Sequence, residues 1–317
     1  MNLNSVFGAV IALAVMSASA MAEPAVVLAP GSAGGGYDAM ARLPFEAMRK
    51  EKIFTDGAQF NNRGGAGGTI GLAEFVNTSK GNDNAVMSMG AILIGGIVLN
   101  NSPVSLKDVT PLVRLTNDTG AIAVPTNSDI KTINDLVAKM KENIGGVAIG
   151  GGSAGGVDHI AMALLAKSNG LEASKLNYIP YAGGAEVVTA LAGGSTTAAI
   201  SGLSEFRSLA QAGRIRIIAV TSKERVEGID APSLTEAGYP VIIGNWRGIV
   251  GAPGMSDEAK KTWLERFEKM HGTETWKATL KKQNWEDAYL SGDDFVKFLD
   301  QEVSNQTATL KDVGLTK

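Results

Sequence analysis

Two glycine-rich segments are the residues of this chain best suited to bind a ligand. Residues 31–41 read GSAGGGYDAMA and residues 152–163 read GSAGGVDHIAMA, so one pattern occurs twice. Each segment lies between an apolar run typical of a buried strand and a run with helical spacing. A helix start offers free N–H groups and a partial positive charge, and glycine lets an anion approach closely. The repeated pattern therefore predicts an anion site.

Two further glycine turns have the same setting. Residues 64–71 read GGAGGTIG before a predicted helix, and residues 181–186 read YAGGAE between a predicted strand and helix. Ligands of open α/β sheets bind at the carboxyl ends of strands, where such turns lie. One turn of this kind is compatible with packing alone, but four of them favour a site for an anion.

The second loop also matches the pattern of a dinucleotide-binding turn. Residues 150–155 fit G-x-G-x-x-G between a predicted strand and helix. That fingerprint requires an acidic residue about 20 positions later, at the end of the next strand. The next predicted strand ends at Tyr181, and Glu172 lies before it. The pattern therefore does not favour a nicotinamide cofactor, and we expect no cofactor.

The same loop satisfies the G-x-S-x-G pattern of a serine hydrolase, with Ser153 as the nucleophile. A general base is then required. The chain has two histidines: His159 follows on the same helix and is expected to point away from the turn, and His271 lies in a charged tail. We expect a binding protein and no enzyme, with an exported serine hydrolase using Ser153 as the alternative.

Composition excludes several other classes. The chain has 317 residues, a formal net charge of −3 and no cysteine. The charge gives no sign of nucleic-acid binding, and the absence of cysteine excludes thiol catalysis, disulfides and thiolate metal sites. Two histidines rule out a His-rich metal site, so no metal is expected.

The first 22 residues predict a signal peptide. An apolar run at residues 5–16 is too short to span a bilayer, and Ala-Met-Ala at 20–22 suits cleavage near Ala22. The segment departs from the usual pattern because no Lys or Arg precedes the apolar run. We expect export and a soluble mature protein in the periplasm, since no later segment has 18 uncharged apolar residues.

After residue 22 the chain alternates between predicted strands and helices. Apolar runs predict strands at 25–30, 58–64, 85–90, 112–116, 121–126, 146–150, 176–181, 197–201, 215–221 and 247–253. Helical spacing predicts helices at 38–50, 69–77, 132–143, 157–170, 185–194, 256–270 and 292–313. The alternation favours an α/β fold with largely parallel sheets. We expect one lobe from residues 23–124 plus 247–317, a second lobe from residues 125–246 inserted in it, and a hinge at the crossings.

The chain after residue 22 resembles the solute-binding receptors of bacterial tripartite tricarboxylate transporters. The resemblance rests on PGSAGGGYDAMAR at 30–42, NNRGGAGGTIG at 61–71, GGGSAGGVDH at 150–159, PYAGGAEVVTALAGG at 180–194, PSLTEAGYP at 232–240 and RGIVGAP at 247–253. It implies a two-lobed periplasmic-binding-protein fold, type II-like, with a hinge cleft. It also implies integral-membrane transporter subunits as partners and cation-coupled uptake. We expect a monomer.

The resemblance also implies which residues hold the ligand. A carboxylate of the ligand lies between the first glycine loop and its counterpart, often through ordered water. These residues are Gly34, Gly35, Gly36, Tyr37, Asp38, Gly152, Ser153, Ala154 and Gly155. The other substrate-binding candidates are Ala66, Gly67, Ser88, Tyr181, Gly183, Ser204 and Arg247. Asp38 has two open roles, as a cap of its own helix or as a partner of a bridging water or ligand hydroxyl.

The ligand itself is expected to be a small di- or tricarboxylate, with a citrate-like one favoured and C4 dicarboxylates and aromatic carboxylates as alternatives. Tyr37 stands where relatives often have Thr, so no relative's substrate can be transferred to this chain. Arginine suits a distal carboxylate because its planar fork pairs with both oxygens. Arg63, Arg207 and Arg247 are the candidates for that role.

Overall fold

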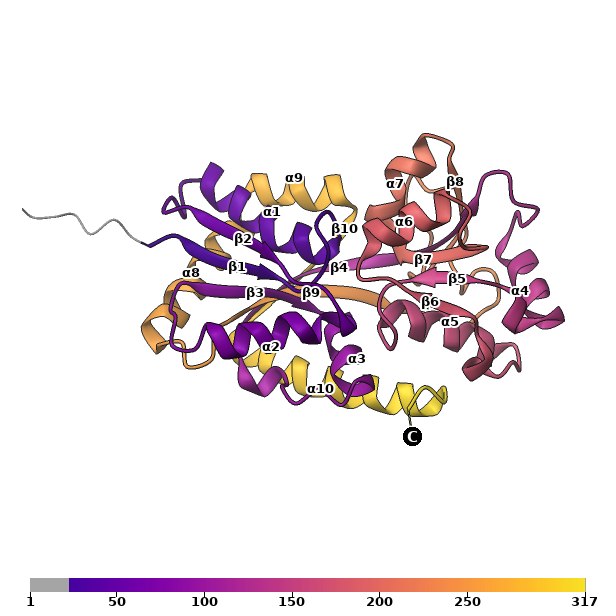
Figure 1. Cartoon of the computed structure of the whole chain (residues 1–317). Coiled ribbons are helices and arrows are strands. Elements are labelled where there is room, and N and C mark those ends of the chain that lie inside the picture. The colour runs from indigo at the N-terminus through magenta and orange to yellow at the C-terminus, as the bar shows by residue number, and fades with distance from the viewer. Residues whose placement is uncertain (1–22, 317) are drawn as a thin grey trace, which may run out of the picture.

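The computed structural model describes residues 23–316, which form two α/β lobes side by side (Figure 1). The predicted signal peptide, residues 1–22 with cleavage near Ala22, lies outside the described residues. Between the lobes runs one long strand, β4 (Thr110–Pro125), and a single sheet continues through both lobes along it.

The first lobe is a sheet covered by helices on both faces, with α1 and α9 on one side and α2 and α10 on the other (Figure 1). Its strands follow the order β2-β1-β3-β9-β4, with β10 on the free side of β4. The elements are β1 (Ala25–Ala29), α1 (Gly36–Lys50), β2 (Ala58–Asn62), α2 (Thr69–Thr78), β3 (Ala85–Gly90), α3 (Ala91–Leu99), β9 (Gly244–Gly251), α8 (Asp257–His271), α9 (Glu274–Gln283), β10 (Trp285–Ser291) and α10 (Gly292–Asp312).

The second lobe continues the sheet in the order β4-β7-β5-β6, and β8 also pairs with β4. Alternate β4 side chains enter different cores, since Ile122 and Val124 pack on one face and Ala121 and Ala123 on the other. The elements are α4 (Ile133–Glu142), β5 (Ile149–Gly151), α5 (Val157–Ser168), β6 (Tyr178–Pro180), α6 (Gly184–Ala192), β7 (Ala198–Gly202), α7 (Leu203–Gln211) and β8 (Ile215–Val220).

β4 replaces the two strands that were predicted at 112–116 and 121–126. The intervening residues Asn117 to Gly120 are of types that favour turns over strands. The strand continues through them because Asp118 is buried and paired. Its ladder with β9 ends at Thr119, and its ladder with β7 begins at Gly120. The expected lobe boundary at 124–125 falls at the far end of this same strand.

The sheet is mixed, so the expectation of largely parallel sheets is wrong. β1 pairs in parallel with β2 and β3, and β5 pairs in parallel with β6 and β7. Every pair that β4 makes with β7, β8, β9 or β10 is antiparallel, as is β3 with β9. The antiparallel pairs arise because β4 leaves the first lobe and β9 returns to it alongside.

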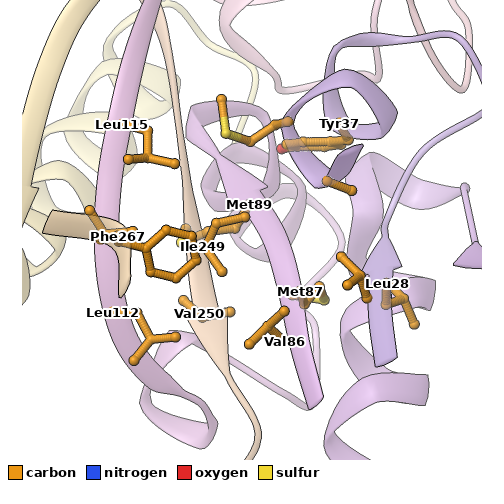
Figure 2. Close-up of a cluster of buried hydrophobic side chains, with 14 of the residues drawn as sticks. Leu28, Tyr37, Val86, Met87, Met89, Leu112, Leu115, Ile249, Val250 and Phe267 are labelled. Atoms are coloured by element: carbon orange, nitrogen blue, oxygen red, sulfur yellow. The ribbon is translucent and has the colours of Figure 1, made fainter. Parts of the chain in front are cut away.

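The core of the first lobe lies between its sheet and helices. Figure 2 shows Leu28, Met87, Leu115 and Ile249 from neighbouring strands, together with Phe267 from α8. These side chains are at most 6% exposed, and burial of each contributes about 1.5–3 kcal/mol. This rigid framework fixes where the strands end and hence where the loops that follow them lie.

The C-terminal helix crosses from the first lobe to the second. Its 21 residues give α10 a length of about 30 Å. Phe295 and Leu299 pack in the first lobe, whereas Val313 belongs to a core of the second, and Lys167 of α5 pairs with Asp312. The tail was expected within the first lobe alone, and sequence periodicity could not show that such a long helix reaches the other one.

Four elements were not predicted from the sequence: α3, α7, α9 and β10. Helix α3 reads AILIGGIVL, and its adjacent glycines concealed it because glycine disfavours helix interiors. A Cβ at Gly95 would overlap the backbone of Gly155 in the second lobe. Gly95 therefore allows close contact between the lobes.

Candidate ligand-binding site

The first glycine loop forms a tight turn between β1 and α1. Gly34 has φ = 78°, and its N–H donates to Asp38 Oδ2 at 2.9 Å. The other Asp38 oxygen accepts from Arg42 Nε at 2.8 Å. Partial burial acts to raise the pKa of Asp38, but the hydrogen bonds from Gly34 and Arg42 outweigh it and hold the pKa below its usual value. Asp38 thus holds the turn that precedes its own helix, and its part in ligand binding stays a prediction.

The second glycine loop repeats this turn between β5 and α5. Gly155 has φ = 76°, and its N–H donates to His159 Nδ1 at 3.1 Å. His159 also stacks on Tyr178, with ring centroids 4.1 Å apart, and burial lowers its pKa to about 4. The expectation that His159 points away from the turn is wrong. Its Nδ1 is engaged by Gly155 and not by Ser153, so this arrangement does not favour the hydrolase alternative.

The two loops meet at a cavity between the lobes, with a volume of about 30 Å³. A water molecule needs at least about 10–15 Å³ on this measure, so the space suits one or two waters. Ser32, Gly36 and Tyr37 line it from the first lobe, and Gly184 and Ser201 from the second. The lobes are closed on each other, and a larger ligand requires them to part.

Half of the predicted binding residues line this cavity. They are Gly35, Gly36, Tyr37, Gly67, Gly152, Ser153, Gly183 and Arg247. The other candidates do not line it, and these are Gly34, Asp38, Ala66, Ser88, Ala154, Gly155, Tyr181 and Ser204. Their part in ligand binding stays a prediction.

The two serines among those outer candidates donate hydrogen bonds within the protein. The hydroxyl of Ser88 is fully buried and donates to the carbonyl of Tyr37 at 2.9 Å. The phenolic oxygen of Tyr37 in turn accepts from Leu93 N–H at 2.9 Å. Ser204 donates to Asp118 Oδ2 at 2.9 Å. These bonds connect the cavity wall to β3, α3 and β4.

Arg247 is the candidate arginine that the fold brings to the cavity. It is 3% exposed, and its Nη1 lies 2.8 Å from Asp118 Oδ2, which is fully buried. Its guanidinium lies against Gly36, where a Cβ would lie 2.7 Å from Nε. Arg63 instead pairs with Glu74 at 3.0 Å on the surface, and Arg207 does not line the cavity.

Two acidic residues of the cavity were missed by the sequence analysis. Glu205 Oε1 accepts from Gly36 N–H at 2.8 Å, and Ser201 also donates to this carboxylate. Asp158 Oδ2 accepts from Gly152 N–H at 3.0 Å. Burial raises the pKa of Glu205 and raises that of Asp158 to about 7. Both lie in the first turn of a helix, a position that favours acids and was the available signal.

Two polar atoms at the cavity have no hydrogen-bond partner in the described part of the chain. They are Ser32 Oγ and Asn245 Oδ1, both buried. Buried polar atoms in proteins are nearly always paired, with water or a ligand where the protein offers nothing. Within residues 23–316, no group of three His, Cys, Asp or Glu side chains is arranged to hold a metal ion. The cavity therefore offers hydrogen bonds and charge.

Comparison with known proteins gives one consistent result. The model of the family described as "Tripartite tricarboxylate transporter family receptor" matches residues 41–315. A protein from the gbd 5′ region of Cupriavidus necator is 25% identical over 321 residues, 98% of this chain and 94% of that one.

Across residues 23–316, no helix combines the length and apolar character needed to cross a membrane.

Solved structures of similar proteins have the same fold. A TctC solute-binding protein from Polaromonas is 26% identical, with a TM-score of 0.63 over 92% of this chain and 99% of that one. MatC of Rhodopseudomonas palustris, solved with malate, has a TM-score of 0.78 at 17% identity, covering 91% and 99%. Rpa4515 of R. palustris, solved with adipate, has a TM-score of 0.82 at 20% identity, covering 92% and 98%.

Proposed function

Because this chain belongs to the receptor family of tripartite tricarboxylate transporters, we propose that it captures a small carboxylate between its lobes and delivers it to membrane transporter subunits. One observation supports this most strongly. Gly36 lies at the start of α1 and lines the closed cleft. Its N–H donates to a carboxylate, which in this structure is that of Glu205. The site is thus chemically suited to the same group on a ligand.

The structure of the cavity guides the choice of ligand to test. The MatC and Rpa4515 structures contain malate and adipate, which are both dicarboxylates. We propose a small di- or tricarboxylate for this chain too, and citrate belongs among the compounds to test. Any of them needs more room than about 30 Å³, so binding requires the lobes to separate and close again.

The remaining parts of the proposal concern location and chemistry. We propose that the chain is exported to the periplasm, is monomeric and performs no catalysis. The last point is supported by the His159–Gly155 hydrogen bond, which turns Nδ1 of the ring toward the backbone. Incubation with a fluorophosphonate followed by mass spectrometry tests it, and an adduct on Ser153 would favour the hydrolase.

Ligand binding is tested by thermal unfolding with malate, adipate and citrate. A ligand of the folded state at about a hundredfold excess over its Kd adds about 2.7 kcal/mol to the free energy of unfolding. Gly35→Asp is expected to abolish the effect, because its Cβ would lie 3.6 Å from Gly184 N across the cleft. The fold is retained, since Asp is a favoured N-cap residue.

Gly145→Asp is the matched control. A Cβ at Gly145 has its nearest neighbour at 3.7 Å, and this position does not line the cavity. This variant is expected to bind like the wild type. Binding that survives in Gly35→Asp, or no response to any carboxylate, contradicts the proposed function.

A further inference from the structure

Glu205 joins the lobes at the point where a ligand carboxylate is expected. It belongs to α7 of the second lobe, and its Oε1 accepts from Gly36 N–H of the first lobe at 2.8 Å. The donors to Glu205 are a backbone amide at a helix start and the hydroxyl of Ser201. These are the donor types that bind free carboxylates. A ligand carboxylate that uses the Gly36 amide must therefore displace Glu205.

The surroundings of Glu205 contain more acid than base. Within the described residues, the charged groups facing it are Arg247 of β9, Asp118 of β4 and Asp158 of α5. Arg247 is already paired with Asp118 at 2.8 Å. The phenol of Tyr37, on α1, stays neutral because burial raises its pKa. A ligand with several carboxylates therefore meets two acidic side chains, Glu205 and Asp158, whereas the facing cation, Arg247, is already paired.

We propose, given the carboxylate-receptor function above, that Glu205 determines specificity by competing with the ligand for the Gly36 amide and by disfavouring ligands in proportion to their negative charge. Glu205 holds the amide when no ligand is bound. After displacement its carboxylate stays at the wall of the cleft, where it repels each further carboxylate of the ligand. Polycarboxylates are weakened most.

The test uses three ligands in which propane carries one, two or three carboxylate groups. Binding of butanoate, glutarate and propane-1,2,3-tricarboxylate is measured by calorimetry in the wild type and in Glu205→Gln, which keeps the volume of the side chain. The variant is expected to bind all three more tightly, with the gain rising about tenfold for each added carboxylate. Glu205→Ala, which leaves no side-chain oxygen for the amide, is expected to show the same order.

Glu186→Gln is the matched control. Glu186 lies in the same lobe, also in the first turn of a helix, and also accepts one backbone N–H, from Ala182 at 3.1 Å. Its side chain is exposed and does not line the cavity. The same loss of charge there is expected to leave all three affinities unchanged.

A pH series provides a second reading. Burial raises the pKa of Glu205, so lowering the pH toward that value neutralises it and brings the wild type closer to Glu205→Gln. Asp158 also titrates, with a pKa of about 7, and the charge of Glu205 is one of the causes that raise this pKa. The comparison is therefore made in the Asp158→Asn background, where the difference with and without Glu205→Gln isolates Glu205. A difference that stays constant with pH contradicts the proposal.

Other outcomes separate this inference from the proposed function. Equal gains for the three ligands, no gain, or a gain reproduced by Glu186→Gln overturns the role of Glu205 and leaves the receptor function intact. No binding by any variant refutes both proposals.

Discussion

The two glycine loops share one turn, but their helix starts have different partners. Gly34 and Gly155 have nearly equal positive φ values, 78° and 76°. In each loop the next glycine donates to a serine carbonyl, from Gly35 to Ser32 at 3.2 Å and from Gly156 to Ser153 at 2.9 Å. The repeated sequence therefore specifies a repeated backbone.

The difference lies in which carboxylate each loop holds. In the second loop, Gly152 donates to Asp158 of its own helix, a bond that is kept when the lobes separate. In the first loop, Gly36 donates to Glu205 of the other lobe, a bond that opening breaks. The same motif therefore binds a carboxylate of its own helix in the second loop, whereas in the first loop it has an N–H that a ligand can use once the lobes separate.

The largest expected effect comes from adding a side chain at Gly36 of the first loop. In the second loop the position equivalent to Gly36 is Val157, which has room for its side chain. Gly36→Ala would place a Cβ against the guanidinium of Arg247 and disturb its buried pair with Asp118. We expect a loss of about 3 kcal/mol in the free energy of unfolding, measured by urea denaturation.

Gly35→Ala is the control for that loss. Its Cβ would lie 3.3 Å from Ser32 O and would not approach Arg247, so about 0.5–1 kcal/mol is expected. Similar losses in the two variants would mean that Arg247 does not depend on the space that glycine leaves at position 36.

A smaller effect, the dependence of stability on pH, distinguishes Asp158 of the second loop from Asp38 of the first. The pKa of Asp158 is raised from 3.8 to about 7, so the folded state binds more protons than the unfolded state in that range. The contribution of Asp158 to the free energy of unfolding therefore falls as pH rises from about 4 to 7. Asp158→Asn removes this contribution, and the fall between about pH 5 and 7 is expected to be about 2 kcal/mol smaller.

Asp38→Asn is expected to behave oppositely, since the pKa of Asp38 is lowered. Its ionised form stabilises the fold at neutral pH, and that stabilisation is lost as pH falls below its usual value of 3.8. Thermal unfolding across pH measures both variants. Equal pH profiles for Asp158→Asn and the wild type would contradict the assigned protonation.

The smallest expected effect concerns the matched serines. Ser32 Oγ has no partner among the described residues and lines a cavity with room for water, so Ser32→Ala is expected to change the free energy of unfolding by at most about 1 kcal/mol. Ser153→Ala, at a partly exposed position, is expected to change it by less than about 0.5 kcal/mol. Melting temperatures without ligand test this, and a clear loss in Ser32→Ala would show an overlooked partner.

Much of the fold followed from local patterns. A helix was predicted at residues 132–143, and α4 is capped there by Thr132, whose Oγ1 accepts from Asp135 N–H at 3.2 Å. The strand predicted at residues 85–90 is β3. Such features depend on neighbouring residues alone, which is why they could be predicted. The continuous β4 and the reach of α10 depend on distant partners and were missed.

The candidate site divides in the same way. The sequence by itself determined the glycine loops, since φ near +75° and a helix start without a side chain are properties of the glycines themselves. Tertiary structure decided which charges meet there. Asp118, Glu205 and Arg247 are far apart in the chain and become neighbours only when β4, α7 and β9 come together. The pairing of buried charges is set by the distances that folding creates, and no local pattern encodes them.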